Sequence, residues 1–266
     1  MQDRYVGDVG DFGKYGLLRF LAGCFDEFPP LTLGVIWYKV ANESHNNDGA
    51  KIQYLREKKS QSFEPCDREL YRNLQNLVIN DRRNLDDVER AQVLPPRSIF
   101  FSEELRFSDC NGRNAQARRA QRRNEWAARA ILATAKCDIV FADPDNGLEC
   151  KSVEPYDRLG PKYAFQEELQ PIIDRGQTLV VYHHTSRQGS ADFQIRYRLE
   201  RFRSLRTQEP ASLALRFRRG NSRAFLIAPA LRHSTLIRRR VDQLLATPWR
   251  QHFELVEVES SAMCIG

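Results

Sequence analysis

The chain has no long apolar run and no internal repeat. No segment approaches the roughly 20 apolar residues that a membrane-spanning helix needs. Its first residues, from Met1 to Arg4, lead to acidic side chains and glycines before any apolar stretch, unlike a secretory signal. These absences predict a soluble, cytoplasmic protein that does not act at a membrane.

The cysteines lack the spacing of a metal site. No two of them form a C-x-x-C pair, which argues against a zinc ribbon, and a reducing cytoplasm disfavours disulfides. The 6 cysteines are Cys24, Cys66, Cys110, Cys137, Cys150 and Cys264. We expect them to be buried or incidental free thiols.

Apolar residues and positive charge are both present in quantity. The 266 residues are 41% hydrophobic, enough for the core of one large α/β domain or of one domain with an insertion. The net charge is +6, with the excess mostly from arginine. Arginine pairs bidentately with phosphate, so this charge favours a polyanionic partner such as a nucleic acid. The alternative is an ordinary basic surface, because many proteins of this charge bind no nucleic acid.

Apolar strand patterns alternate with helical patterns along the chain. Strands are expected at residues 31–38, 98–101, 138–142 and 177–182, in a hairpin of 214–217 with 223–228, and at an edge strand 253–258. Helices are expected at residues 14–21, 68–78, 85–92, 114–134, 163–175 and 235–245. This order predicts a single Rossmann-like α/β domain over 1–266, with a mostly parallel sheet, an antiparallel hairpin at one edge and a helical insertion at 56–97.

The strongest local pattern lies where the strand at 138–142 ends. Asp143, Pro144, Asp145, Asn146 and Gly147 follow that apolar strand directly. Ligands of open α/β sheets bind at the carboxyl ends of strands, so the carboxylates predict a functional site. The alternative is a capped turn, because Asp-Pro and Asn-Gly are common turn dipeptides.

A second polar cluster follows the strand at 177–182. It contains Tyr182, His183, His184 and Arg187. Successive side chains of a strand point to opposite faces, so one histidine is expected to face the site and the other to be packed. A purely structural role for each histidine is the alternative.

Two further segments are candidates for ligand contacts. Residues 5–16 hold four glycines with Asp8, Asp11 and Lys14 between them, which predicts a flexible loop close to a ligand, with Lys14 opening the first helix. The spacing fits neither a dinucleotide fingerprint nor a P-loop. The polar loop 38–49 follows the first strand and is expected either to hold a cofactor or to be a solvated surface loop.

Arginines gather in three places, one of them interleaved with aromatic residues. They are Arg118, Arg119, Arg122, Arg123 and Arg129; then Arg196, Arg198, Arg201, Arg203 and Arg206 around Tyr197 and Phe202; then Arg216, Arg218 and Arg219. Such clusters either grip phosphates and bases or are solvated faces.

Taken together, these motifs resemble the RlmJ-type family of ribosomal-RNA adenine N6-methyltransferases. Tyr5-Val6-Gly7-Asp8, Asp11 and Lys14-Tyr15 match the spacing of that family's H-A-G-N-x-x-D-V-x-K-H segment. Residues 38–49 loosely match its cofactor loop, and 143–146 occupy the position of its D-P-P-Y motif. Residues 179–183 match its A-L-W-Y-P-like strand end. The matches are partial, but their order covers most of the chain.

The resemblance implies S-adenosylmethionine as cofactor and a nucleic acid as substrate. The implied catalytic residues are Asp143, Pro144, Asp145, Asn146, Lys14 and His183. The implied cofactor contacts are Tyr38, Asn42, His45, Gly7 and Asp11, and the implied substrate contacts are Tyr5, Tyr182, His184 and Arg187. Asp143 and the Pro144 carbonyl would accept hydrogen bonds from the target amine.

The chain departs from that family at the position of the base-stacking tyrosine. Asn146 stands there, and Asp145 replaces the second proline. Tyr182 or Tyr5 would have to supply the aromatic ring. Two alternatives therefore stand beside methyl transfer: a metal-dependent nuclease or phosphodiesterase that holds a divalent metal with Asp143, Asp145 and His183, and a nucleic-acid-binding protein without catalysis. The sequence does not indicate an oligomeric state.

Overall fold

A seven-stranded sheet forms the centre of the computed structural model, which describes residues 1–44, 48–185, 189–203, 210–220 and 223–256. The strands run in the order β2-β1-β3-β6-β8-β7-β9. Their bounds are β1 Leu33–Trp37, β2 Ile99–Phe101, β3 Ile139–Asp143, β6 Thr178–His184, β7 Leu213–Phe217, β8 Arg223–Ala228 and β9 Phe253–Val256. A separate pair, β4 Gly147–Leu148 and β5 Tyr163–Ala164, is parallel.

Strands β2, β1, β3 and β6 are parallel neighbours, whereas β8, β7 and β9 continue the sheet in antiparallel pairs. The predicted Rossmann-like, mostly parallel sheet is therefore confirmed. The predicted hairpin of β7 and β8 is present, and β9 is the edge strand, as predicted. The hairpin itself does not form the edge, because it lies between β6 and β9.

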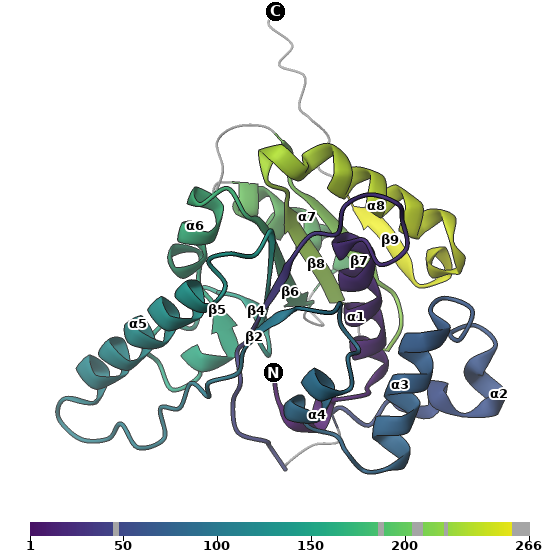
Figure 1. Cartoon of the computed structure of the whole chain (residues 1–266). Helices are drawn as coiled ribbons and strands as arrows, with labels where there is room; N and C mark the ends of the chain where they lie inside the picture. The colour runs from purple at the N-terminus through teal and green to yellow at the C-terminus, as the bar shows by residue number, and fades with distance from the viewer. Residues whose placement is uncertain (45–47, 186–188, 204–209, 221–222, 257–266) are drawn as a thin grey trace, which may run out of the picture.

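Helices cover both faces of the sheet (Figure 1). They are α1 Val9–Ala22, α2 Glu57–Ser60, α3 Arg68–Ile79, α4 Leu85–Arg90, α5 Ala115–Ala133, α6 Gln166–Asp174, α7 Ala191–Arg203 and α8 Ser234–Ala246. Short 3-10 helices are η1 Asp3–Tyr5, η2 Gln53–Leu55, η3 Gly160–Lys162, η4 Leu231–His233 and η5 Pro248–Gln251. Among the described residues, no helix is long and apolar enough to cross a membrane.

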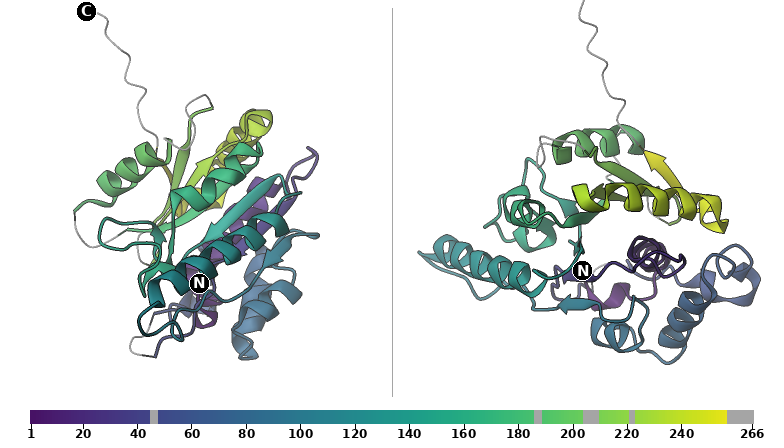
Figure 2. Two further views of the ribbon diagram at one scale, coloured as in Figure 1. Left: turned by 90° about the vertical axis from the view of Figure 1, so that its left-hand side faces the viewer. Right: turned by 45° about the horizontal axis from the view of Figure 1, so that its top comes forward.

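Each face of the sheet carries its own cluster of buried apolar residues. Val35 of β1 packs in one cluster with α1, α3 and α8, and its neighbour Ile36 packs in the other with α5, α6 and α7. This alternation is the two-residue period of a strand covered on both faces. In the left view of Figure 2, α7 and α8 accordingly lie on opposite sides of the strands.

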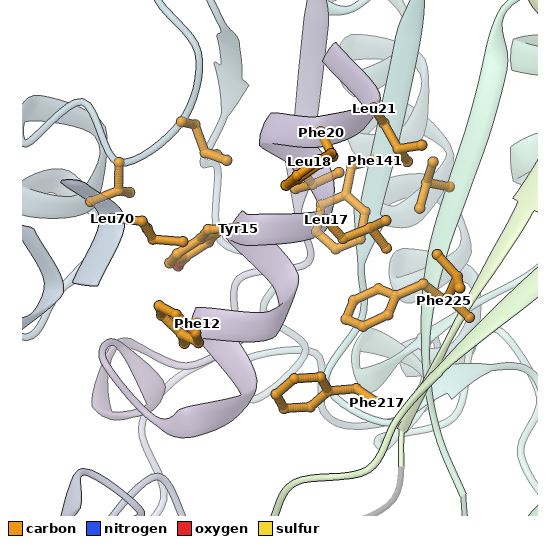
Figure 3. Packing of buried hydrophobic residues seen from close by; sticks show 14 of the residues in the cluster. Phe12, Tyr15, Leu17, Leu18, Phe20, Leu21, Leu70, Phe141, Phe217 and Phe225 are labelled. Carbon is orange, nitrogen blue, oxygen red and sulfur yellow. The ribbon is translucent and has the colours of Figure 1, made fainter. Parts of the chain in front are cut away.

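The segment at 56–97, predicted as a helical insertion, contains α2, α3 and α4 between β1 and β2. Helix α3 packs against α1, where Tyr15 points toward Leu70 (Figure 3). On the other side of α1, Leu17 points toward Phe141 and Phe225 of the sheet (Figure 3). Helix α1 is thus enclosed between the sheet and this segment.

The prediction of a glycine loop at 5–16 is wrong, because α1 already begins at Val9. Asp8 is its N-cap and accepts a hydrogen bond from the Gly10 amide. A Cβ at Gly13 would lie 2.5 Å from the Phe217 ring, and one at Gly16 would lie 2.2 Å from the Trp249 ring. These glycines serve close packing of α1 rather than flexibility.

Candidate functional site

A cavity of about 490 Å³ lies at the carboxyl ends of β3 and β6, beside the start of α1. Its lining includes Asp143, Pro144, Asp145 and Asn146 from the end of β3. Helix α1 and the residues before it add Tyr5, Asp8, Asp11 and Lys14. The end of β6 adds Tyr182 and His184, and the start of β8 adds Arg223. Segments predicted separately therefore converge on one site.

Lys14 lies at the buried end of this cavity between two carboxylates. Its Nζ donates to Asp143 Oδ2 at 2.7 Å and to Asp11 Oδ1 at 2.9 Å. Burial alone lowers the pKa of Lys14, but Asp11 and Asp143 outweigh burial and raise it above the usual value. Burial raises the pKa of Asp11 despite the neighbouring ammonium group. A protonated Lys14 thus ties α1 to the end of β3.

Asp8 organises the wall of the cavity near β8. Beyond the Gly10 bond, Asp8 Oδ2 accepts from the Lys51 amide at 3.1 Å, and Asp8 Oδ1 accepts from Arg223 Nη1 at 3.3 Å. A Cβ at Gly10 would lie 1.3 Å from Arg223 Nη1, so a larger residue there would displace this guanidinium from its present position. Arg223 was not predicted as a site residue, and the only signal for it is its position at the start of an apolar strand.

Asp145 is held by Gln2, Lys162 and the Met1 amino group, which no sequence pattern links to it. Its Oδ2 accepts from Gln2 Nε2 at 3.0 Å and lies 3.4 Å from Lys162 Nζ, and its Oδ1 lies 3.8 Å from the Met1 amino group. Burial raises the pKa of Asp145, but the Met1 amino group and Lys162 bring the net pKa below its ordinary value. Within the described residues, Oδ1 is buried without a hydrogen-bond partner.

The two histidines of β6 face opposite sides, as the strand period predicts. Tyr182 and His184 line the cavity. His183 is buried beneath the segment after β3, and its Nδ1 accepts a hydrogen bond from the Leu148 amide at 3.2 Å. Burial and the nearby Arg198 lower the pKa of His183 to about 3. The catalytic role predicted for His183 therefore needs correction: His184 is the histidine at the cavity.

Several predicted cofactor residues do not line the cavity. Tyr38 points to the opposite face of the sheet, where its hydroxyl donates to Glu168 at 2.9 Å. Asn42 Oδ1 accepts from the Arg4 amide at 3.3 Å. Gly7 is at a turn with φ of 80°. Strand β1 ends at Trp37, and the residues directly after it make these other contacts instead of lining the cavity.

Two predicted contacts, His45 and Arg187, lie outside the described residues, as does Arg206. The same loop that holds Asn42 does reach the cavity further along, through Asp48, Gly49 and Lys51.

No group of three or more His, Cys, Asp or Glu side chains in the described ranges is arranged to hold a metal ion. The predicted metal set is not brought together, because His183 lies on the other face of β6 from Tyr182 and His184 and already accepts the Leu148 hydrogen bond.

The fold and the cavity define a Rossmann-like α/β protein with a ligand-sized site at its carboxyl edge. No protein-family model and no curated protein matches this chain. Among solved structures, the crystal structure of protein LPL1258 from Legionella pneumophila str. Philadelphia 1, with the family label DUF519, is similar over 96% of this chain and 98% of that chain. The two chains are 10% identical, with a TM-score of 0.43. At that distance the likeness carries no argument about activity.

Proposed function

We propose that this protein is an S-adenosylmethionine-dependent methyltransferase that modifies an amine of a nucleic acid. One observation carries the proposal: Asp143 and Pro144 line a cavity at the carboxyl edge of the sheet together with the rings of Tyr5 and Tyr182. Asp143-Pro144 supplies acceptors for an amine, and the two rings supply the aromatic surface that the motif itself lacks.

The residues of the cavity fit the cofactor in size and charge. A volume of about 490 Å³ lies within the range of small-molecule sites. The lining combines carboxylates with Lys14, Lys51 and Arg223, which suits a ligand that carries both charges and hydroxyl groups. The buried Oδ1 of Asp145, without a hydrogen-bond partner among the described residues, is a further acceptor for such a ligand.

S-adenosylmethionine, when bound, supplies an electrophilic methyl group. The chain's own residues position the acceptor. Lys14 holds Oδ2 of Asp143 in place, and we assign the other carboxylate oxygen to accept a hydrogen bond from the target amine. Tyr182 or Tyr5 stacks on the ring that carries this amine, which orients the nitrogen toward the methyl group.

The test combines ligand binding with methyl transfer to RNA and DNA oligonucleotides. S-adenosylmethionine and S-adenosylhomocysteine should raise the melting temperature, and Asp143→Asn should lower methyl transfer at least about 100-fold, as loss of a transition-state hydrogen bond does. Asp138→Asn is the control, because Asp138 precedes the other end of the same strand and bonds Thr32 there. Circular dichroism establishes that both variants are folded.

Other outcomes separate the alternatives. Metal-dependent cleavage of the oligonucleotides, removed by EDTA, would instead establish the nuclease. The protein would be a nucleic-acid-binding protein without catalysis if it bound the oligonucleotides but showed no turnover. In that case neither S-adenosylmethionine nor S-adenosylhomocysteine would change its melting temperature. Full methyl transfer by Asp143→Asn would refute the role given to Asp143.

A further inference from the structure

Helix α7 has one apolar face toward the sheet and one aromatic face toward solvent. Ile195, Leu199 and Phe202 are fully buried against the sheet. Phe193 and Tyr197, four residues apart, lie on the opposite side of the helix, with 69% and 39% of their surfaces exposed. The packing of α7 on the sheet therefore does not use these two rings.

The two exposed rings form a pair. Their centroids are 6.5 Å apart and their planes differ by 17°. Nearly parallel aromatic rings at a surface offer flat faces on which another planar ring can stack. Exposed aromatic residues that lie together are also a feature of binding surfaces rather than of ordinary solvated helices.

Cationic side chains surround this pair. Arg198 lies 5.9 Å from the Tyr197 ring centre. Arg201 donates a hydrogen bond to the Tyr197 hydroxyl, which lowers the pKa of that tyrosine, and Lys151 adds to the lowering. Arg196 is exposed on the same helix. We call Lys151, Phe193, Arg196, Tyr197, Arg198 and Arg201 the α7 patch.

Acidic side chains near the patch are fewer than its cations. Glu149 lies 3.6 Å from Arg201, and Glu200 is exposed on α7. Asp192 at the start of the helix pairs with Arg216 at 3.3 Å. The α7 patch therefore keeps a positive excess beside its aromatic pair.

The patch is joined to both strand ends of the cavity. Strand β6, which places Tyr182 and His184, leads along the chain into α7. The segment that follows Asp143 passes through β4 and reaches Lys151, and Arg198 of α7 donates a hydrogen bond to the Glu149 carbonyl on the way. The Arg198 hydrogen bond thus ties α7 to the segment that follows Asp143.

We infer that the α7 patch binds an unpaired segment of the nucleic acid whose target nucleotide enters the cavity. This inference rests on the proposed function and names its substrate as a single strand. Bases of a single strand expose their faces and stack on aromatic rings, whereas those of a duplex are covered by their neighbours. The arginines and Lys151 contact the phosphates between those bases.

Fluorescence anisotropy with labelled oligonucleotides tests the inference. The probes are RNA and DNA single strands of about 16 nucleotides, the upper range of such sites, and the matching duplexes. The variant is Phe193→Ala with Tyr197→Ala. The control is Phe28→Ala, an exposed phenylalanine that also carries an arginine over its ring, with Arg239 at 4.3 Å, but that lies before β1.

The wild-type protein should bind a single strand more tightly than a duplex. The double variant should weaken single-strand binding at least about fivefold, and Phe28→Ala should leave it unchanged. Lys151→Gln should reduce the slope of log affinity against log salt by about 0.7. Binding of RNA alone, DNA alone or both supports the inference and identifies the substrate.

Three results would overturn the inference: no single-strand binding by the wild type, equal binding of duplex, or unchanged affinity in the double variant. If the double variant loses self-association instead of oligonucleotide affinity, the patch is a protein contact. The thermal shift by S-adenosylmethionine, measured on the same variants, separates this failure from that of the proposed function. A retained shift with unchanged oligonucleotide affinity rejects the patch alone, and patch-dependent binding without a shift rejects the methyltransferase alone.

Discussion

Helices α5 and α7 are both rich in arginine and pack on the same face of the sheet, yet they use their arginines differently. On α5, Arg122 lies 2.5 Å from Asp109, and Arg129 lies 2.9 Å from Glu103. Arg123 is buried and binds Glu168. On α7, Arg198 and Arg201 instead lie beside an exposed aromatic pair.

This difference shows when an arginine cluster indicates a binding surface for nucleic acid. Arg122, Arg123 and Arg129 of α5 meet carboxylates of their own chain, which neutralise much of their charge. Arg118 and Arg119 donate hydrogen bonds to backbone carbonyls. The α7 patch keeps exposed rings and a positive excess, and both features favour a planar, anionic ligand. The number of arginines in a segment therefore says less about nucleic-acid binding than the position of the nearest carboxylates and rings. Each of the following changes tests this contrast.

Replacing the buried arginine of α5 should have the largest effect. Arg123 makes five hydrogen bonds, two to Glu168 and three to backbone carbonyls. Arg123→Met removes all five hydrogen bonds and leaves the largely buried Glu168 carboxylate without its cation, although Tyr38 and the Phe165 amide still donate to it. The variant should lower the free energy of unfolding by about 3–5 kcal/mol. Urea denaturation measures it. A loss below about 1 kcal/mol would mean that Arg123 contributes no more than an exposed ion pair does.

The two faces of α7 should respond very differently to truncation. Leu199→Ala removes a fully buried side chain and should cost about 2–5 kcal/mol of unfolding free energy. Phe193→Ala, on the exposed face of the same helix, should change it by less than about 0.5 kcal/mol. Similar losses in both variants would contradict the orientation of α7.

Acid should destabilise the protein through the histidine next to α7. The folded-state pKa of His183 is about 3, lowered by burial and by Arg198, and lies below the ordinary value of 6.5. Below pH 6.5 the unfolded chain binds a proton that the folded protein does not, so stability falls toward pH 3 by at most about 1.4 kcal/mol per pH unit.

His183→Gln should remove this part of the pH dependence, because glutamine does not titrate and its amide oxygen can accept the Leu148 hydrogen bond. Denaturant unfolding at pH 7.5 and pH 5 measures the difference. An unchanged pH dependence in the variant would mean that His183 is not kept neutral by its surroundings.

The smallest effect is expected at the surface of α5. Arg122→Gln breaks an exposed ion pair with Asp109 and should lower the free energy of unfolding by about 0.2–1 kcal/mol. High salt should reduce the difference further, because exposed charges are screened. The same variant should bind single-stranded oligonucleotides as the wild type does. A marked loss of binding would show that Arg122 of α5 also contacts the oligonucleotide.

The sequence predicted the strands well because their signal is local. The apolar run at 138–142 corresponds to β3 at Ile139–Asp143, and the run at 177–182 corresponds to β6. It failed at the start of α1, where the glycines indicated a loop. The space for a glycine-rich helix is provided by Phe217 and Trp249, which are more than 200 residues away along the chain.

The site was predicted in part, because some of its residues follow local patterns and others depend on contacts between distant segments. Asp143, Lys14, Tyr5 and Tyr182 were predicted and all line the cavity, although Tyr38 does not. Arg223 was missed because a single arginine before an apolar strand has no distinctive pattern. Its contact with Asp8 depends on the pairing of β8 with β6, where Arg223 lies opposite His184.

The sequence by itself determined which segments form strands and which polar residues follow them, because apolar periodicity is a property of neighbouring residues. It also determined that Asp143 and Pro144 stand at a carboxyl end. The tertiary structure alone decided that Lys14 joins Asp143, that His184 rather than His183 faces the cavity, and which arginines meet a carboxylate. Those outcomes depend on strand register and helix packing between distant segments, which no local pattern contains.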